Sequence, residues 1–519
     1  TWFVARLPFP ARSRWAIFGS AAETPQAAVA CQKGSTPNRA AMGSPWSQPA
    51  NWECCVVVVD PYSTGAMVAA ELLQRRFQVI ALWTKEVGEN RGHYPASAKG
   101  VPDRFKAELE QQNSLAETAQ LIKEAADDTD LVAVMCGGET GVKVTDALAE
   151  FMGLRGNSTA DGMDNRRDKR VQQTAVKNAG LRSVRSACGT TWSEVVDFAE
   201  QEKYPVIVKP VESAGSDGVK KCDTKEEAQQ HFELLMNSQR KCGAQGAAVL
   251  LQEFLKGTEY IVDIVTRDGV HKTTMVWVYD RRAANGGDFV NFGQKCVLAD
   301  QDVAQELIAY AKGCLDALRV TNGATHTEVM MTEDGPCLVE VNSRCHGANG
   351  AWMPLVQALT GYTQVGVCVD AFLNPAAFHE LPSVPPSPFL AAGEMVSLIS
   401  YHEGLIEATP GFEEVRQLKS FTSLEENVHK GDYLQKTTDL FTVTGMAVLI
   451  HEDPKRLASD VAHIRHMEAH GELFHLKKTL LTRLGSRGVL DGCAPCFGLP
   501  CLPLQALQEL LPGKTAKLN

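Results

Sequence analysis

The feature that most constrains the fold is an unbroken, mostly β-branched run, "CCVVVV", at positions 54–59. A turn rich in Pro, Ser and Gly follows, then a segment with helical spacing and a second apolar run that ends at Trp83. A strand without alternating polar residues is typical of a parallel sheet buried on both faces. The order of strand, Gly-containing turn and helix recurs at 130–154, and such alternation predicts a parallel sheet. We therefore expect a Rossmann-like domain over residues 51–155.

The carboxyl ends of parallel strands form the edge at which such sheets bind ligands. Asp60, the loop Pro61–Gly65 and the segment Gly137–Gly141 would lie at this edge and form a candidate ligand crevice. Taken singly, each of these positions is better explained as an ordinary turn residue.

Composition excludes several classes of protein. The chain has 519 residues, enough for several domains with their own cores. Its net charge of −11 argues against a nucleic-acid surface. We find no apolar run near the about 20 residues that a membrane span needs. The 15 cysteines are scattered, mostly within apolar segments, which favours reduced thiols and a cytoplasmic protein over a disulfide framework.

The two ends of the chain differ from the middle. Residues 1–50 are rich in Ala, Ser, Pro and Arg and almost free of acidic residues. They are expected to be a disordered leader or a transit segment, in which case an organelle such as a plastid would be the destination. Residues 481–519 form a poorly defined tail. Neither segment is expected to contribute to the fold.

Lys209 ends the short apolar segment "PVIVKP" and is followed at once by a loop that contains Ser213, Gly215, Ser216 and Gly218. Glycine lets consecutive backbone N–H groups converge on an anion, and a neighbouring lysine adds a positive charge for phosphate oxygens. The spacing does not match a P-loop. A surface hairpin would give much the same pattern.

Two further segments could bind the same ligand as this loop. In "VLLQEFLKGTEYIVDIV" (249–265), Gln252 and Glu253 end one strand and Glu259 opens another. An extended linker of this kind can pair with an adenine edge, and the later carboxylate can accept from ribose hydroxyls. A β-hairpin is the simpler alternative. In "NRRDKRVQQTAVKNAGL" (165–181), Lys169 lies in the first turn of an amphipathic helix, which would ordinarily be a solvated face.

The segment "CLVEVNSR" (337–344) places Glu340, Asn342 and Arg344 at alternate positions, and a continuous strand would point all three the same way. The turn at Gly335 predicts a hairpin that brings Glu328 close to Glu340. Two adjacent carboxylates need a cation, because like charges on neighbouring strands are destabilising. Carboxylate and amide oxygens favour Mg²⁺ that also binds nucleotide phosphates.

Taken in their order along the chain, from the helix with Lys169 to "EVNSR", these segments resemble the ATP-grasp superfamily. The resemblance covers roughly residues 54–480. Within it, "VVVVDPYSTG", "GGETGVKVTDALAEFMGLRGN", "NRRDK" and "YDRRAANGGDFVNFG" resemble the carboxylate–amine ligases that include L-amino acid ligases. The resemblance implies an α/β (α+β) protein with the Rossmann-like domain at its N-terminus. An ATP-grasp domain would follow at 156–375, with a mobile lid at about 183–255, and a β-rich subdomain at 376–480 would complete the ligase.

The resemblance also implies roles for individual residues. Lys169 and Lys209 would hold ATP phosphates, and the 213–218 loop would close over them. Gln252, Glu253 and Leu255 would face adenine, and Glu259 the ribose. Glu328, Glu340 and Asn342 would ligate Mg²⁺, with Mn²⁺ as an alternative ion. Arg344 would act with Lys209 in catalysis, by stabilising the acyl phosphate and the tetrahedral adduct. The substrate pocket would include Glu139, Arg281, Arg282 and His326.

The implied reaction joins a small-molecule carboxylate to an amine, both expected to be amino acids, through an acyl phosphate with release of ADP and phosphate. Two alternatives stay open: a biotin-carboxylase-like component, although the chain has no biotin-carrier motif, and a nucleotide-binding scaffold without catalysis. Oligomeric state, including a homodimer, is also open.

Overall fold

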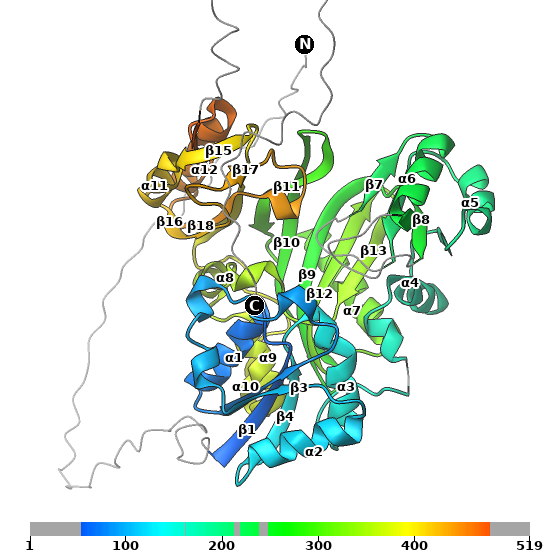
Figure 1. The fold of residues 1–519 in the computed structure, drawn as a ribbon, viewed down its shortest axis with the longest axis vertical. Coiled ribbons are helices and arrows are strands. Elements are labelled where there is room, and N and C mark those ends of the chain that lie inside the picture. Colours follow the sequence, from blue (N-terminus) through cyan, green and yellow to red (C-terminus); the bar gives the residue numbers. More distant parts are fainter. Residues whose placement is uncertain (1–52, 161, 212–217, 238–247, 478–519) are drawn as a thin grey trace, which may run out of the picture. The chain divides into compact units, whose positions relative to one another are not determined.

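The computed structural model describes residues 53–477, with gaps at 161, 212–217 and 238–247 (Figure 1). The predicted leader and tail lie outside the described residues, as do Ser213, Gly215 and Ser216 of the predicted phosphate loop.

The first apolar runs form a four-stranded parallel sheet, as predicted, in the order β3–β2–β1–β4. Its strands are β1 (Cys54–Val59), β2 (Gln78–Trp83), β3 (Ala107–Glu110) and β4 (Asp130–Cys136). Its helices are α1 (Thr64–Gln74), α2 (Leu115–Ala126) and α3 (Val142–Phe151). The last five residues of β1 are fully buried, which explains the unbroken apolar run.

At the carboxyl edge of this sheet, Asp60 has a structural role. Its buried carboxylate accepts hydrogen bonds from the backbone N–H and hydroxyl of Thr84, at 2.8 and 2.7 Å, and from the hydroxyl of Thr140 at 2.6 Å. A Cβ atom at Gly65 would lie 2.7 Å from the backbone of Gly137, so the two turns are in close contact. For Asp60, Gly65 and Gly137 the turn interpretation is therefore the better one.

A separate four-stranded antiparallel sheet, in the order β5–β8–β6–β7, encloses its own apolar core. It consists of β5 (Ser186–Gly189), β6 (Val206–Pro210), β7 (Lys220–Cys222) and β8 (Val249–Glu253), with α5 (Val196–Gln201) and α6 (Lys225–Asn237). Three residues after β8 the chain enters β9 (Gly257–Arg267), which belongs to a different sheet. The hairpin interpretation of residues 249–265 is therefore wrong, because β8 and β9 do not pair.

The largest sheet has eight strands in the order β13–β12–β9–β10–β11–β14–β18–β16 (Figure 1). Besides β9 these are β10 (Val270–Ala284), β11 (Gly287–Cys296), β12 (Gly323–Thr332), β13 (Gly335–Asn342), β14 (Ala392–Leu398), β16 (Phe421–Glu426) and β18 (Gly445–His451). The last three come from the C-terminal part of the chain, which thus continues the same sheet.

The remaining elements surround this sheet. A small sheet joins β15 (Gly404–Ala408) to β17 (Tyr433–Leu434) and β19 (His475–Leu476). The other helices are α4 (Lys169–Asn178), α7 (Asp302–Ala317), α8 (Met353–Thr360), α9 (Gln364–Leu373), α10 (Pro375–Glu380), α11 (Pro410–Arg416) and α12 (Pro454–His470).

Helix α4 is fixed to the edge strand β13 through two glutamines. The Gln172 amide exchanges hydrogen bonds with the backbone of Val341 at 2.8 and 3.0 Å, and Gln173 donates to the Leu338 carbonyl at 2.9 Å. The side chains thereby satisfy backbone groups that an edge strand otherwise leaves unpaired. Lys169, at the start of α4, is buried rather than solvated, so the solvated-face interpretation of this helix is wrong.

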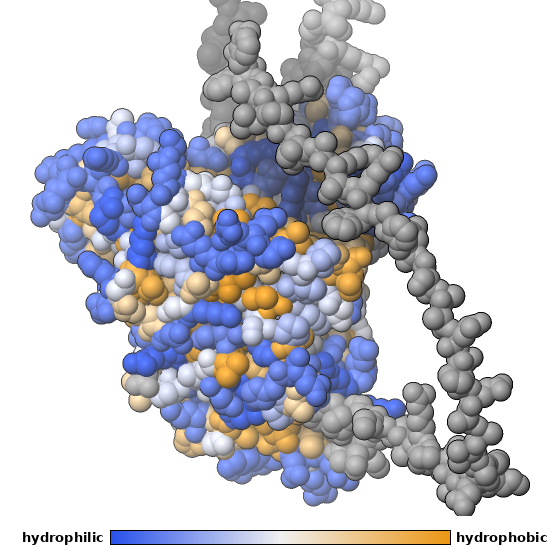
Figure 2. Space-filling model, turned by 180° about the vertical axis from the view of Figure 1, so that it is seen from behind, coloured by the Kyte–Doolittle hydropathy of each residue, from blue (hydrophilic) through white to orange (hydrophobic). Residues whose placement is uncertain are grey.

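Within the described ranges, no helix combines the length and apolar character that crossing a membrane requires. The ten cysteines there are all free thiols. The face of the molecule in Figure 2 is mainly hydrophilic, with hydrophobic residues in small scattered groups.

One buried ion pair fixes the segment that leads into α4. Arg166 is fully buried, and its Nε lies 2.6 Å from the carboxylate of Asp146 in α3. Asn157 donates to the same carboxylate at 3.0 Å and also bonds to the Asn322 carbonyl, just before β12. The N-terminal sheet, α4 and the large sheet are therefore connected through one polar cluster.

We expect Arg166→Met to lower the free energy of unfolding by about 3 to 5 kcal/mol, because it leaves the Asp146 carboxylate buried without its cation. Arg166→Met combined with Asp146→Leu should recover most of the loss. Urea denaturation followed by circular dichroism measures both. Equal stability of the two variants would contradict a contribution from the buried charge.

Candidate active site

One face of the eight-stranded sheet carries the polar residues of the candidate site. Alternate residues of a strand share a face, and directly paired residues of neighbouring strands do too. The register pairs His326 with Asp263, and Met330 with Glu259. It also pairs Tyr279 of β10 with Gln294 of β11. Side chains from these strands line a cavity of about 330 Å³.

The metal-binding prediction rests on Glu328 and Glu340, and the two lie directly opposite each other on β12 and β13. Immediately beyond this pair the register shifts, so that Val339 is an extra residue on β13. Such bulges re-aim side chains and are common beside active sites. Here the bulge lets residues on both sides of Val339 line the cavity.

The donor atoms at this position suit a hard cation. Glu340 pairs with Lys169 at 2.7 Å through one oxygen and accepts from the Asn342 amide at 3.2 Å through the other. The Asn342 amide nitrogen is used in this bond, which leaves its oxygen for a ligand. Glu328 accepts bonds through Oε1 from His326 and Tyr279, at 3.2 and 3.3 Å. Two carboxylates and an amide oxygen fit Mg²⁺ or a similar ion.

Lys209 differs from the other cations of the cavity. It is 7% exposed at the end of β6 and makes no ion pair with a carboxylate among residues 53–477 outside the gaps. Burial, assisted by the charge of Lys169, lowers the pKa of the Lys209 ammonium to about 8. A buried cation without a counter-ion, facing a cavity, is a site for an anion.

The end of β8 and its linker form another wall of this cavity. Gln252, Glu253 and Leu255 all line it, together with apolar side chains such as Ile207. The Glu253 carboxylate is committed elsewhere, because it accepts from the backbone N–H of Arg185 at 2.9 Å and pairs with its guanidinium at 2.6 Å. Gly218, the described part of the predicted phosphate loop, has a positive φ of 73°.

The prediction that Arg344 continues the strand is wrong, because β13 ends at Asn342. Arg344 lies in the following turn, where its backbone N–H donates to the Asn342 carbonyl at 2.9 Å. It nevertheless lines the cavity. Its Nε lies 3.0 Å from Glu139 and its Nη1 donates to the Cys345 carbonyl. Two of its three nitrogens are thus held by the protein.

Comparison with known proteins agrees with this arrangement. Residues 202–351 match the protein family described as ATP-grasp domain. That range contains Lys209, the β8–β9 linker, Glu328 and Glu340.

Residues 202–351 form an ATP-grasp domain.

Several known proteins are similar to this chain. Dapdiamide A synthase of Enterobacter agglomerans is 28% identical over 347 residues, which are 66% of this chain and 80% of that protein. Alanine–anticapsin ligase of Bacillus subtilis is 24% identical over 254 residues, and the match spans about half of its length (53%). Among solved structures, the L-amino acid ligase of Bacillus licheniformis superposes with a TM-score of 0.63 at 16% identity, covering 82% of this chain and 98% of that one. The predicted fold class is confirmed, whereas the domain boundaries stay predictions.

Beside the ATP-grasp domain, the four expected substrate residues have different surroundings. Arg281 pairs with Glu259, the predicted ribose acceptor, and both line the cavity. Arg282 pairs with Asp280 outside the cavity and is half exposed. Glu139 bridges Arg344 and Arg167, whose Nη1 lies 3.1 Å from it.

His326 is bonded through both ring nitrogens, to Asp263 at 3.0 Å and to Glu328. Although burial disfavours the charged ring, these two hydrogen bonds raise the pKa of His326 to about 9. It is therefore tied to the predicted metal ligands rather than free for a substrate.

Sequence reasoning missed several residues of the cavity. Gln294 is 6% exposed and its side-chain oxygen has no hydrogen-bond partner among the described residues. Leu440 and Met446 reach the cavity from the C-terminal part of the chain. The segment "NFGQKC" gave no signal for Gln294, because Asn291 and Lys295 in the same strand are polar too.

The lowered pKa of Lys209 predicts that its chemical modification depends on pH. Acetic anhydride modifies the neutral amine, so the modification of Lys209 should rise with a midpoint near pH 8, as its lowered pKa requires. Inorganic triphosphate should move the midpoint upward, because its negative charges favour the ammonium form. Mass spectrometry of the peptide, with exposed lysines as reference, measures the midpoint. A midpoint near that of exposed lysines, unaffected by triphosphate, would contradict the anion site.

Proposed function

We propose that this chain is an ATP-dependent ligase that joins a carboxylate to an amine through an acyl phosphate, releasing ADP and phosphate. The observation that carries the proposal is the pairing of Glu328 with Glu340 in a cavity that the buried Lys209 also lines. Among the described residues, Lys209 makes no ion pair with a carboxylate. Dapdiamide A synthase and an L-amino acid ligase are among the related proteins, and they support amino acids as substrates.

For the nucleotide, we assign the two lysines to the phosphates and the β8–β9 linker to adenine. The backbone of residues 253–255 would pair with the adenine edge, because the Glu253 carboxylate is held by Arg185. Glu259 would meet the ribose, and Arg281 beside it fixes the direction of its carboxylate.

Glu328, Glu340 and Asn342 would hold one or two Mg²⁺ ions. When bound, Mg²⁺ neutralises phosphate charge and orients the transferred phosphoryl group. The residues supply the oxygen donors, and Lys169 holds Glu340 in place through their 2.7 Å pair. The fit rests on the donor chemistry of the three side chains.

We assign Arg344 to the second half of the reaction. Glu139 and the Cys345 carbonyl hold its Nε and Nη1, and its Nη2 has no hydrogen-bond partner in the described part of the chain. A guanidinium held in this way is pre-organised, so it loses little freedom when it meets a developing oxyanion. This suits charge that builds up on the acyl phosphate and the tetrahedral adduct.

For the substrates, we assign the part of the cavity bounded by Gln294, Leu440 and Met446. Gln294 lies on β11, two strands beyond Glu259 of β9, which separates it from the proposed ribose position by about 10 Å across the sheet. Its free carboxamide oxygen can accept a hydrogen bond from an ammonium or amide group. The two apolar side chains would contact the substrate's aliphatic part.

The direct test incubates the protein with ATP, Mg²⁺ and defined pools of amino acids, and follows phosphate release and product mass. We expect release that requires two substrates, with ADP rather than AMP as the nucleotide product. The Glu340→Gln variant serves as a control that keeps the side-chain volume and loses a metal ligand. Release of AMP, or release at the same rate in the control, would contradict the proposal.

For Arg344, we expect Arg344→Met to bind ATP nearly normally and to form almost no amide, because interactions made late in a reaction raise turnover more than binding. Arg344→Lys should rescue poorly, since a single ammonium cannot copy a planar guanidinium. Calorimetry measures nucleotide affinity and mass spectrometry measures product. Loss of ATP affinity in proportion to amide formation would identify Arg344 as a nucleotide-binding residue instead.

A further inference from the structure

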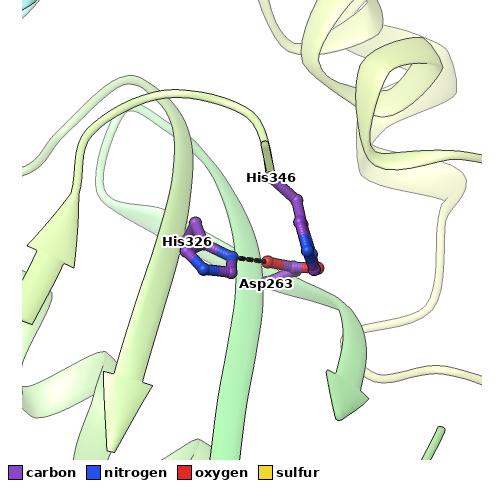
Figure 3. A group of neighbouring side chains, drawn as sticks. All are labelled: Asp263, His326 and His346. Carbon is purple, nitrogen blue, oxygen red and sulfur yellow. Dashed lines mark hydrogen bonds and ion pairs between the residues drawn. The ribbon is translucent and has the colours of Figure 1, made fainter. Parts of the chain in front are cut away.

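Three buried residues, Asp263, His326 and His346, lie together in one group (Figure 3). They come from β9, β12 and the turn after β13, and none is more than 4% exposed. In Figure 3 both imidazole rings point toward the Asp263 carboxylate, one from each side. The Nδ1 atoms of His326 and His346 lie 3.0 and 2.9 Å from its two oxygens.

A cluster of this composition could hold a metal ion, but its contacts describe a hydrogen-bonded group instead. Trp277 donates to Asp263 at 2.7 Å, so the carboxylate already accepts from three donors. A metal between the three residues would have to displace both imidazole contacts with the carboxylate. The cluster is therefore complete without an ion.

The two histidines differ in their contacts with Glu328. His326 Nε2 lies 3.2 Å from Oε1 of Glu328, whereas His346 makes no hydrogen bond or ion pair with Glu328 among the described residues. Carboxylates only accept hydrogen bonds, so a ring between Asp263 and Glu328 donates through both nitrogens. Asp263 thereby fixes the ring at one end, and the ring fixes one Glu328 oxygen at the other.

We infer that His326 is a positioning residue, which Asp263 holds in place and which orients the Glu328 carboxylate for metal binding. The inference rests on the proposed function, since it assumes that Glu328 is a ligand. With Oε1 occupied by His326 and Tyr279, Oε2 is the oxygen presented to a cation. A carboxylate that is already oriented loses less side-chain freedom on binding.

A competing role makes the opposite prediction. If His326 only neutralised the two carboxylates by its positive charge, removing that charge would tighten the binding of a cation, because like charges repel. Orientation predicts weaker binding instead. The sign of the change in metal affinity therefore separates the two roles.

Asparagine and glutamine variants of His326 test its hydrogen bonds to Asp263 and to Glu328 separately. His326→Asn places an amide nitrogen near the position of Nδ1, which keeps the bond to Asp263 and loses the one to Glu328. His326→Gln extends toward Nε2 and can restore the contact with Glu328. His346→Asn is the matched control, because it changes a buried imidazole on the same aspartate without touching Glu328.

The experiment titrates Mn²⁺ into the full-length protein with ADP present and follows bound Mn²⁺ by electron paramagnetic resonance. We expect the Kd for Mn²⁺ to rise about tenfold in His326→Asn, to recover partly in His326→Gln and to stay within about twofold of wild type in His346→Asn. The Kd for ADP without metal should be unchanged in all three variants, and circular dichroism reports whether they fold.

Unchanged or tighter Mn²⁺ binding in His326→Asn would overturn the inference, as would an equal loss in His346→Asn. If His326→Asn fails to fold, His326→Gln decides, and Mn²⁺ binding in that variant at least as tight as in wild type would overturn the inference. A wild-type protein that binds no Mn²⁺ with ADP present would instead contradict the proposed function, so the two failures are distinguishable.

Discussion

The site depends on one pairing, in which β12 and β13 place Glu328 directly opposite Glu340. Two carboxylates at this spacing repel each other, so the hairpin alone would be unfavourable. The protein offsets the repulsion from two sides, with Lys169 on Glu340 and His326 on Glu328. Oε2 of Glu328 accepts no hydrogen bond among the described residues, so it remains available for the divalent cation proposed above.

Around this pair, parts of the chain that are distant in sequence contribute residues to the site. The antiparallel sheet of β5–β8 supplies Lys209, and the loop after β4 supplies Glu139. The C-terminal part of the chain supplies Leu440 and Met446. A reaction through an acyl phosphate needs such a convergence, because water would hydrolyse the intermediate in an open site. Positioning and charge neutralisation account for most of the catalysis expected from this arrangement.

Local patterns predicted the local structure well. The unbroken run at 54–59 indicated a strand of a parallel sheet, and the turn at Gly335 indicated the hairpin with its two glutamates. Contacts across long stretches of chain could not be predicted, because no periodicity encodes them. Examples are the pair of Glu139 with Arg344 and the passage of the chain from β8 into a second sheet. The bulge at Val339 was also missed, since an extra residue leaves the apolar pattern of β13 almost unchanged.

The most direct test of the account follows an oxygen atom. The carboxylate substrate found in the screen is labelled with ¹⁸O, and the phosphate released during amide formation is analysed by mass spectrometry. An acyl phosphate forms when a carboxylate oxygen attacks the γ-phosphorus, and cleavage of the acyl carbon–oxygen bond by the amine leaves that oxygen on phosphate. The account predicts one ¹⁸O atom in each phosphate released. Unlabelled phosphate, or label found in AMP, would contradict it.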